Sequence, residues 1–143
     1  MPLNNFSVGR DISLDIIGPQ GPLRFNLITN FTSKQDATEQ KVKGLDGIMR
    51  PLRFFDGWTG SFSLERMDST VDDYFSQLEA NYYAGLNENP VTITETIQEP
   101  TGGVSQYRFM GVLLSLHDDG AWSADATVKQ TLGFMASRRV KIA

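Results

Sequence analysis

Few side chains in this chain of 143 residues can carry acid–base or metal chemistry. It has one histidine, His117, and no cysteine, which excludes thiolate nucleophiles, disulfides and zinc sites made of several histidines or cysteines. His117 stands beside Asp118-Asp119-Gly120, a pattern typical of a hairpin turn, so we expect it to be solvated and not a general base. The sequence therefore predicts no enzyme active site and no cofactor.

Two pairs of neighbouring acids and one pair of glycines do not form a catalytic, metal-binding or phosphate-binding site either. Asp72 and Asp73 are adjacent on a predicted helix, where their side chains point about 100° apart and cannot act as a pair. Asp118 and Asp119 lack the spaced oxygen ligands of a calcium loop. Gly102-Gly103 lies between two predicted strands, with no helix N-terminus to hold a phosphate. We expect turns and helix-end charges at these positions.

The charge of the chain is small but unevenly distributed. The net charge is −4 at pH 7, which disfavours a DNA-reading domain because such domains carry a basic face. Residues 65–99 hold eight acids and one base, whereas residues 1–64 and 100–143 are each slightly basic. The acidic block is either a solvated face or one side of a head-to-tail contact between copies.

Alternation of apolar and polar residues predicts a mainly β protein that forms a single domain over residues 1–143. There is no long apolar run to span a membrane, and the first residues lack the apolar core of a signal peptide. The segment around Met110 to Leu114 is apolar on both strand faces, which predicts cover by a second layer or a second subunit. We expect strands at residues 12–16, 23–27, 37–43, 58–64, 91–98, 104–116 and 121–134.

One helix is predicted, over about residues 70–84. Ser69 is a suitable N-cap whose hydroxyl could accept a hydrogen bond from the amide of Asp72, and Gly85 can end the helix. An apolar stripe is formed by Val71, Phe75, Leu78 and Tyr82. The outer acidic face is formed by Asp72, Asp73 and Glu79. We expect Trp58, Trp122 and the helix tyrosines to belong to the core.

Residues 44–57, GLDGIMRPLRFFDG, predict an extended apolar loop. Three glycines and Pro51 interrupt both helix and strand patterns, yet loops are usually polar because they face water. Such a loop either folds back on its own core or contacts a partner, and the pattern leaves both open. Its apolar residues are Leu45, Ile48, Met49, Leu52, Phe54 and Phe55.

In order and length, these segments resemble the tail tube proteins of contractile bacteriophages. The resemblance covers nearly the whole chain. No single motif is diagnostic, so the segments support the resemblance only when they are taken together. The most informative stretch is 124–142, an alternating strand that ends in a basic, apolar tail. The segments that carry it are GWTGSFSLER, STVDDYFSQLEANYYAG, VTITETIQ, QYRFMGVLLSL and WSADATVKQTLGFMASRRVKI.

The resemblance implies an antiparallel β-barrel or sandwich with one flanking helix, assembled as hexameric rings that stack into a hollow tube. The tube would lie inside a tail sheath, end at a baseplate and a tail terminator, and conduct duplex DNA without sequence-specific binding. It would be part of the virion, made in the host cytoplasm, with no membrane anchor and no catalytic residues. The same fold occurs in the Hcp rings of type VI secretion and in R-type pyocin tubes.

The expected contact residues follow from the resemblance together with the charge and strand patterns. The apolar loop would contact an adjacent ring through Leu45, Ile48, Met49, Arg50, Leu52, Arg53, Phe54 and Phe55. The basic C-terminal contact would use Arg138, Arg139 and Lys141. Strand alternation assigns Asn26, Thr92, Thr94 and Thr96 to the lumen. Two alternatives stay open, a ring subunit of another contractile injection system and a small monomeric β-barrel that binds a ligand.

Overall fold

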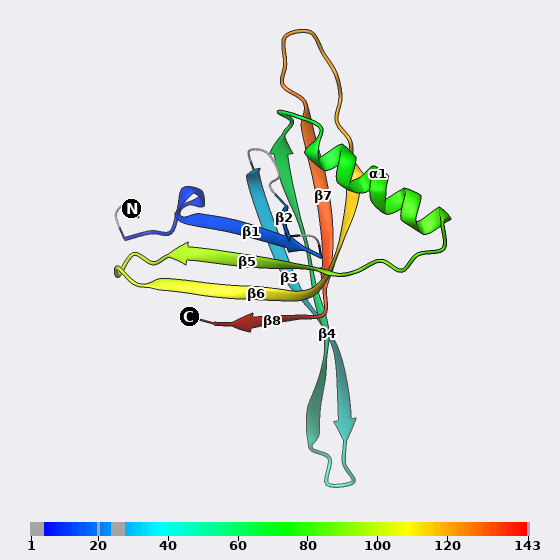
Figure 1. The fold of residues 1–143 in the computed structure, drawn as a ribbon. Coiled ribbons are helices and arrows are strands. Elements are labelled where there is room, and N and C mark those ends of the chain that lie inside the picture. The colour runs from blue at the N-terminus through cyan, green and yellow to red at the C-terminus, as the bar shows by residue number, and fades with distance from the viewer. Residues whose placement is uncertain (1–4, 20, 24–27, 143) are drawn as a thin grey trace.

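The computed structural model describes residues 5–19, 21–23 and 28–142 (Figure 1). It is mainly β with one α-helix, as the sequence predicts. The elements are a 3-10 turn at Gly9–Asp11, then β1 (Ile12–Gly18), β2 (Gly21–Leu23), β3 (Ile28–Lys43), β4 (Met49–Glu65), α1 (Thr70–Tyr83), β5 (Val91–Gln98), β6 (Val104–Asp118), β7 (Lys129–Ala136) and β8 (Arg138–Lys141).

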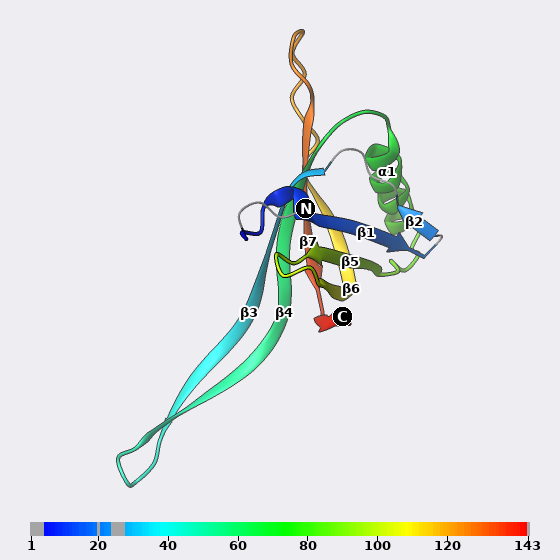
Figure 2. The same cartoon turned by 90° about the vertical axis from the view of Figure 1, so that its left-hand side faces the viewer.

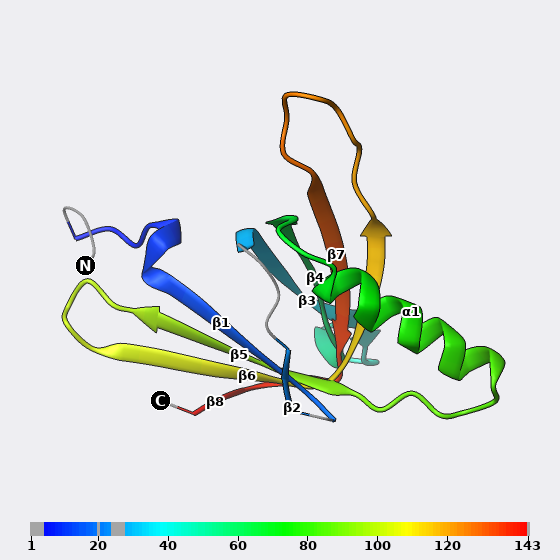
Figure 3. The same ribbon diagram turned by 45° about the horizontal axis from the view of Figure 1, so that its top comes forward.

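The eight strands form one antiparallel, sharply bent sheet with two arms (Figures 1 and 3). Strand β6 belongs to both arms, because its first half pairs with β5 and β8 and its second half pairs with β7. The first arm has the order β1-β5-β6-β8, with short β2 beside β1. The second arm has the order β6-β7-β4-β3. The expected barrel or sandwich is therefore realised as an open sheet folded around one core.

The bend lies where β6 passes from one arm to the other. Gly111 has a φ of 62°, in the left-handed region that favours glycine, and a Cβ there would lie 2.5 Å from the Ser137 hydroxyl oxygen. Ser137 separates β7 from β8, and its amide donates to the Met110 carbonyl at 2.9 Å. Strand β6 and the β7–β8 segment therefore pass from one arm to the other at the same level of the sheet.

The core fills the angle between the two arms. Its centre is an aromatic cluster in which the rings of Phe109 and Phe134 meet edge-on, with centroids 5.4 Å apart, and Trp58 contacts Phe109 at 5.9 Å. Trp58 is therefore part of the core, as expected, but Trp122 is not, because 72% of it is exposed. The buried apolar residues that make up this core are Ile16, Phe62, Leu64, Val71, Val91, Ile93, Phe109, Val112, Leu114, Leu132, Phe134 and Ala136.

The helix α1 covers one side of this core and has the predicted bounds to within one residue. Gly85, with a φ of 76°, ends it, and the Leu86 amide donates to the Asn81 carbonyl at 2.9 Å. The predicted cap by the Ser69 hydroxyl is wrong: this hydroxyl donates to the Asp73 carboxylate, and Asp68 accepts from the Thr70 amide instead. Along the predicted apolar stripe, Val71 is buried but Tyr82 is exposed.

The prediction of an irregular loop over residues 44–57 is wrong. The turn occupies only residues 44–48, and residues 49–57 are the outer half of β4, paired with β3 from Phe55↔Ala37 to Met49↔Lys43. Pro51 fits because, within the described part of the chain, β3 alone pairs there, so its missing N–H is tolerated at a sheet edge. Gly57, with a φ of 93°, lies at a register shift between the two halves. The two strands form a long hairpin that projects from the body (Figure 2).

Two other strand predictions differ from the structure in extent. The strand expected at 37–43 begins at Ile28, because it pairs along the whole of β4. The strand expected from residue 121 begins at Lys129, and residues 119–128 form a connection longer than a tight hairpin turn. Residues 24–27 of the second predicted strand lie outside the described residues.

Candidate functional site

The apolar side chains at the tip of the β3–β4 hairpin are exposed. Phe55 is 66% exposed, and Leu45, at the turn, is fully exposed. Of the two interpretations of this segment, the structure excludes folding back on the chain's own core. The exposed apolar residues of the tip are Val42, Leu45, Ile48, Met49, Leu52, Phe54 and Phe55. An apolar group of this size on the surface is typical of an interaction site.

The hairpin tip has two faces of different composition, because neighbouring residues of a strand point to opposite sides. The register Lys43↔Met49, Lys41↔Pro51 and Glu39↔Arg53 defines the basic face, which consists of Lys41, Lys43, Met49, Pro51, Arg53 and Phe55 together with Glu39. The register Val42↔Arg50, Gln40↔Leu52 and Thr38↔Phe54 defines the apolar face, which consists of Val42, Leu52 and Phe54 together with Arg50, Gln40 and Thr38.

Both arginines of the tip have partners within the hairpin. The Arg50 guanidinium contacts the Asp46 carboxylate at 2.8 Å, and Arg53 contacts Glu39 at 3.6 Å. The hydrogen bond from Arg50, helped by the Ile48 amide, lowers the pKa of Asp46. These pairs are exposed and screened by solvent, so they contribute little to stability.

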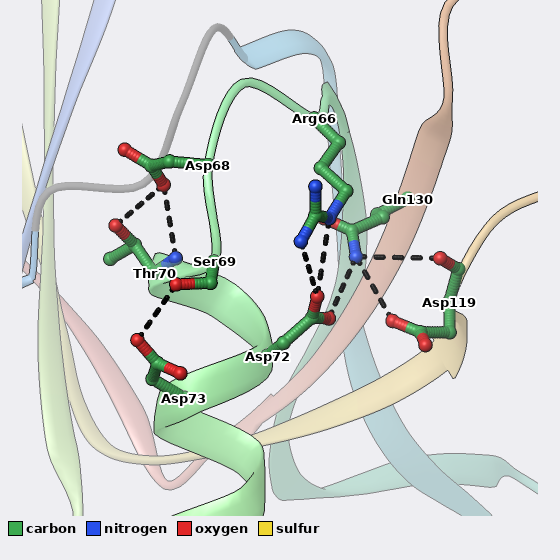
Figure 4. A network of polar contacts seen from close by, with 8 residues as sticks. All are labelled: Arg66, Asp68, Ser69, Thr70, Asp72, Asp73, Asp119 and Gln130. Carbon is green, nitrogen blue, oxygen red and sulfur yellow. Dashed lines mark hydrogen bonds and ion pairs between the residues drawn. The ribbon is translucent and has the colours of Figure 1, made fainter.

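The outer face of α1 is acidic, but not through all three of the expected residues. Asp73 and Glu79 are exposed on it. Asp72 is not part of this face, because its carboxylate points toward β7 and accepts from Arg66 and from the Gln130 amide (Figure 4). Asp72 faces the body because the first turn of α1 lies beside β7, with the Gln130 amide within hydrogen-bond distance of its carboxylate.

Asp72 belongs to a polar network that ties α1 to β7 and to the end of β6. Gln130 is fully buried, and its amide nitrogen lies 3.0 Å from Asp72 Oδ1 and 2.9 Å from Asp119 Oδ1 (Figure 4). Burial acts to raise the pKa of Asp72, but hydrogen bonds from Asp119, Arg66 and Gln130 lower it overall. The hydrogen bond to Asp72, with burial, raises the pKa of Asp119. Asp72 therefore ionises before Asp119 as the pH rises.

A groove of about 660 Å³ lies between the second half of α1 and β6. Its helix side includes Leu78, and Leu114 and Leu116 of β6 line its other side. Tyr82 and Tyr83, expected in the core, are 75% and 79% exposed at its edge. Sequence reasoning missed this groove, because it depends on how α1 packs across β6.

The first arm has a polar face. Thr92, Thr94 and Thr96 are half-buried on one side of β5, and the Gln106 amide of β6 donates to Thr96 at 3.2 Å. Residues paired beside the threonines include Ser13, Asp15 and Arg108. Three of the four residues expected in a lumen therefore share one face, and Asn26 lies outside the described residues.

The three basic residues near the C-terminus are on β8 but do not share one environment. Arg138 and Lys141 are exposed. The Arg139 guanidinium lies over the rings of Trp58 and Tyr107, at 4.1 and 4.2 Å from their centroids, so it has partners in its own chain. It also faces the buried Glu95, whose pKa is raised by burial and lowered in part by Arg139.

The described residues hold no group of three or more histidine, aspartate or glutamate side chains placed to bind a metal ion. His117 is on strand β6 and exposed, and its ring lies against Gly133 of β7. None of the helices in the described part of the chain is long and apolar enough to cross a membrane.

Comparison with known proteins identifies the fold. No family model and no curated protein matches the sequence. Among solved structures, a chain of the anti-feeding prophage cap, described as its tube terminating cap, matches with a TM-score of 0.67 and 7% identity over 99% of this chain and 94% of that chain. A chain of the PVC sheath-tube complex, an extracellular contractile injection system, matches with a TM-score of 0.63 and 11% identity over 91% and 88%.

A third structure, the virion of a native gene transfer agent, matches with a TM-score of 0.52 and 14% identity over 96% of this chain and 100% of that chain. These neighbours are tube and cap components of contractile injection systems and a component of a phage-like particle. The chain therefore has the contractile tail tube fold, which confirms the expected resemblance at the level of fold.

Proposed function

We propose that this chain is a structural subunit of a tail tube. Six copies form a ring, and rings stack into a hollow tube inside a sheath, between a baseplate and a terminator. The tube is part of a virion and conducts duplex DNA during ejection. Support comes from the fold, from the polar face of the first arm and from the exposed hairpin tip.

One observation carries this proposal: the first arm is a four-stranded sheet with an available edge on both sides. Within the described residues, no strand pairs with the outer edge of Ile12–Asp15 in β1, and β8 pairs only with β6. Since all pairings in the arm are antiparallel, β8 of one copy runs antiparallel to β1 of the next around a rotation axis. Two exposed edges of this kind complete each other when the sheet closes into a barrel.

The dimensions of such a barrel suit a DNA conduit. Six copies of four strands, spaced about 4.8 Å apart and tilted by about 40°, give a backbone circle about 48 Å across. Side chains reduce the free width to about 38 Å, which admits duplex DNA with water around it. Threonine side chains do not neutralise phosphates, and on this face Asp15 offsets the charge of Arg108. Phosphate neutralisation by lysine and arginine is what makes a protein bind DNA, so a wall with little net positive charge would let the duplex pass.

Electron microscopy of the concentrated protein tests this proposal. We expect negatively stained rings with sixfold symmetry and hollow tubes made of stacked rings. A strictly monomeric protein at high concentration, measured by light scattering, would contradict it and favour a small ligand-binding barrel.

A second function, a terminal ring of a contractile injection system, is favoured by the match to the tube terminating cap. The two functions differ in growth: a tube subunit adds rings indefinitely, whereas a cap forms single rings that end a tube. Filament length against protein concentration separates them. The genes that adjoin the coding sequence separate a phage from a secretion or pyocin system, since a phage carries capsid and packaging genes.

A further inference from the structure

The groove between α1 and β6 combines apolar and acidic character. Tyr82, Tyr83 and Leu86 expose most of their surface at its helix end, and the two tyrosine rings meet edge-on with centroids 5.2 Å apart. Its charged lining residues are Glu79 and Glu88, and among the described residues no lysine or arginine lines it. Such a groove suits a partner that presents apolar side chains beside positive charges.

The basic face of the hairpin tip offers this combination. Met49, Pro51 and Phe55 are exposed on it, next to Lys41 and Lys43. Residues 41–53 contain four basic residues and one acid. Among the described residues, ion pairs engage Arg50 and Arg53 but neither lysine, so the lysines are the cations available to a partner.

The two surfaces lie at opposite ends of the molecule (Figures 1 and 2). The hairpin projects away from the body on one side, and α1 flanks the body on the other. A chain cannot bring its own tip to its own groove without dismantling the β3–β4 ladder, so contact between them requires a second copy. A contact between different surfaces of identical copies is heterologous and repeats along an axis.

We propose that the basic face of the hairpin tip of one copy docks into the α1–β6 groove of a second copy. Lys41 and Lys43 approach Glu79 and Glu88, while Met49 and Phe55 pack against Tyr82, Tyr83 and Leu86. This rests on the proposed function in one respect, since in a tube the contact would join successive rings. Beyond that function, the docking proposal names the groove that receives the hairpin tip and the face of the tip that enters the groove.

Charge reversal with rescue is the first test. Lys41→Glu with Lys43→Glu, and separately Glu79→Lys with Glu88→Lys, should each lower the association constant at least tenfold in sedimentation velocity. Combining all four changes should restore association to within about threefold of the wild type. Lys34→Glu, on the same hairpin but away from its tip, is the control and should associate normally. Failure of the fourfold variant to recover, with each variant folded by circular dichroism, would overturn the pairing.

Cross-linking provides a test that does not depend on tube formation. The natural chain has no cysteine, so single-cysteine variants carry no background. Met49→Cys mixed with Tyr83→Cys should give a disulfide-linked heterodimer under mild oxidation. Leu52→Cys, on the apolar face of the tip, is the matched control and should cross-link to Tyr83→Cys at least tenfold less.

The two proposals fail in different ways. If microscopy finds neither rings nor tubes but the 49–83 cross-link forms, the tail tube function is wrong and the docking holds. If tubes form but the cross-link is absent, or equals that of the Leu52→Cys control, the docking is wrong and the tail tube function stands.

Discussion

Phe62 and Phe55 are seven residues apart on the same strand and have opposite environments. Phe62 is 1% exposed in the inner half of β4, whereas Phe55 is 66% exposed in the outer half. The inner half pairs with both β3 and β7 and packs into the aromatic core, whereas the outer half pairs, among the described strands, with β3 alone. Both residues are phenylalanines, so residue type does not decide their burial. Phe62 is buried because the other arm of the sheet covers it. None of the described residues supplies such a covering layer to the hairpin tip, whose apolar side chains are exposed.

The largest expected effect is on assembly. Phe54→Ser with Phe55→Ser should abolish ring stacking, because the docked Phe55 alone represents about 1.5–3 kcal/mol of lost burial per subunit, and the loss is repeated in every subunit of a ring. The free energy of unfolding of the isolated subunit should change by less than about 0.5 kcal/mol, as for other exposed positions. Negative-stain microscopy and urea titration measure the two effects. If the double variant unfolds, the tip is part of the chain's own core after all.

The second effect is on folding and uses the same strand. Phe62→Ala should lower the free energy of unfolding by about 3–5 kcal/mol, because it leaves a cavity in a close-packed core. Phe55→Ala, the matched substitution in the outer half, should leave it nearly unchanged. Urea denaturation of both variants under one set of conditions measures the difference. Equal losses in the two variants would remove the distinction between body and tip.

Local patterns in the sequence predicted the body well. The strand over 91–98 and the helix over 70–84 were predicted because alternation and helical spacing persist where one face meets the core. The hairpin tip was mispredicted for the opposite reason: with apolar residues on both faces, residues 49–57 show no alternation to mark a strand. Gly57 and Pro51, taken as breakers, instead occupy a register shift and a sheet edge.

Contacts between distant segments could not be predicted at all. Asp72 was expected to face outward because its neighbours on α1 do, yet it meets Asp119, which is 47 positions away in the chain. Tyr82 lies at the right helical spacing for the apolar stripe, but α1 extends past the part of the sheet that could cover it. Both errors arise because helical spacing fixes the relative direction of side chains but not the extent of the surface on which they pack.

The third effect is smaller and concerns the polar contact that ties α1 to the body. The pKa of Asp119 is raised, so its contribution to stability is present when it is protonated and is lost as the pH rises through its folded-state pKa. The pKa of Asp72 is lowered, so its contribution is lost as the pH falls through its own folded-state pKa. The pair is therefore most stabilising in mild acid, between these two values.

Asp119→Asn tests this arrangement, because an amide reproduces the protonated carboxyl at every pH. We expect the variant to be more stable than the wild type at neutral pH, by less than about 1 kcal/mol since the site is solvent-exposed. The gain should disappear in mild acid, where the wild-type Asp119 is itself protonated. Thermal melts across this range measure it. A variant that is less stable at neutral pH would show that the charged form of Asp119 is the stabilising one.

The smallest effect separates the role of charge at the tip from that of apolar burial. Exposed ion pairs contribute about 0–1 kcal/mol each, so charge should set the register and rate of association while apolar burial supplies most of the affinity. Salt at about 1 M reduces the Debye length to about 3 Å and screens such pairs. Raising salt should therefore slow the assembly of rings, followed by light scattering, more than it dissolves finished tubes. If finished tubes fall apart in high salt while Phe54 and Phe55 prove dispensable, the basic residues of the tip supply the affinity and its phenylalanines do not.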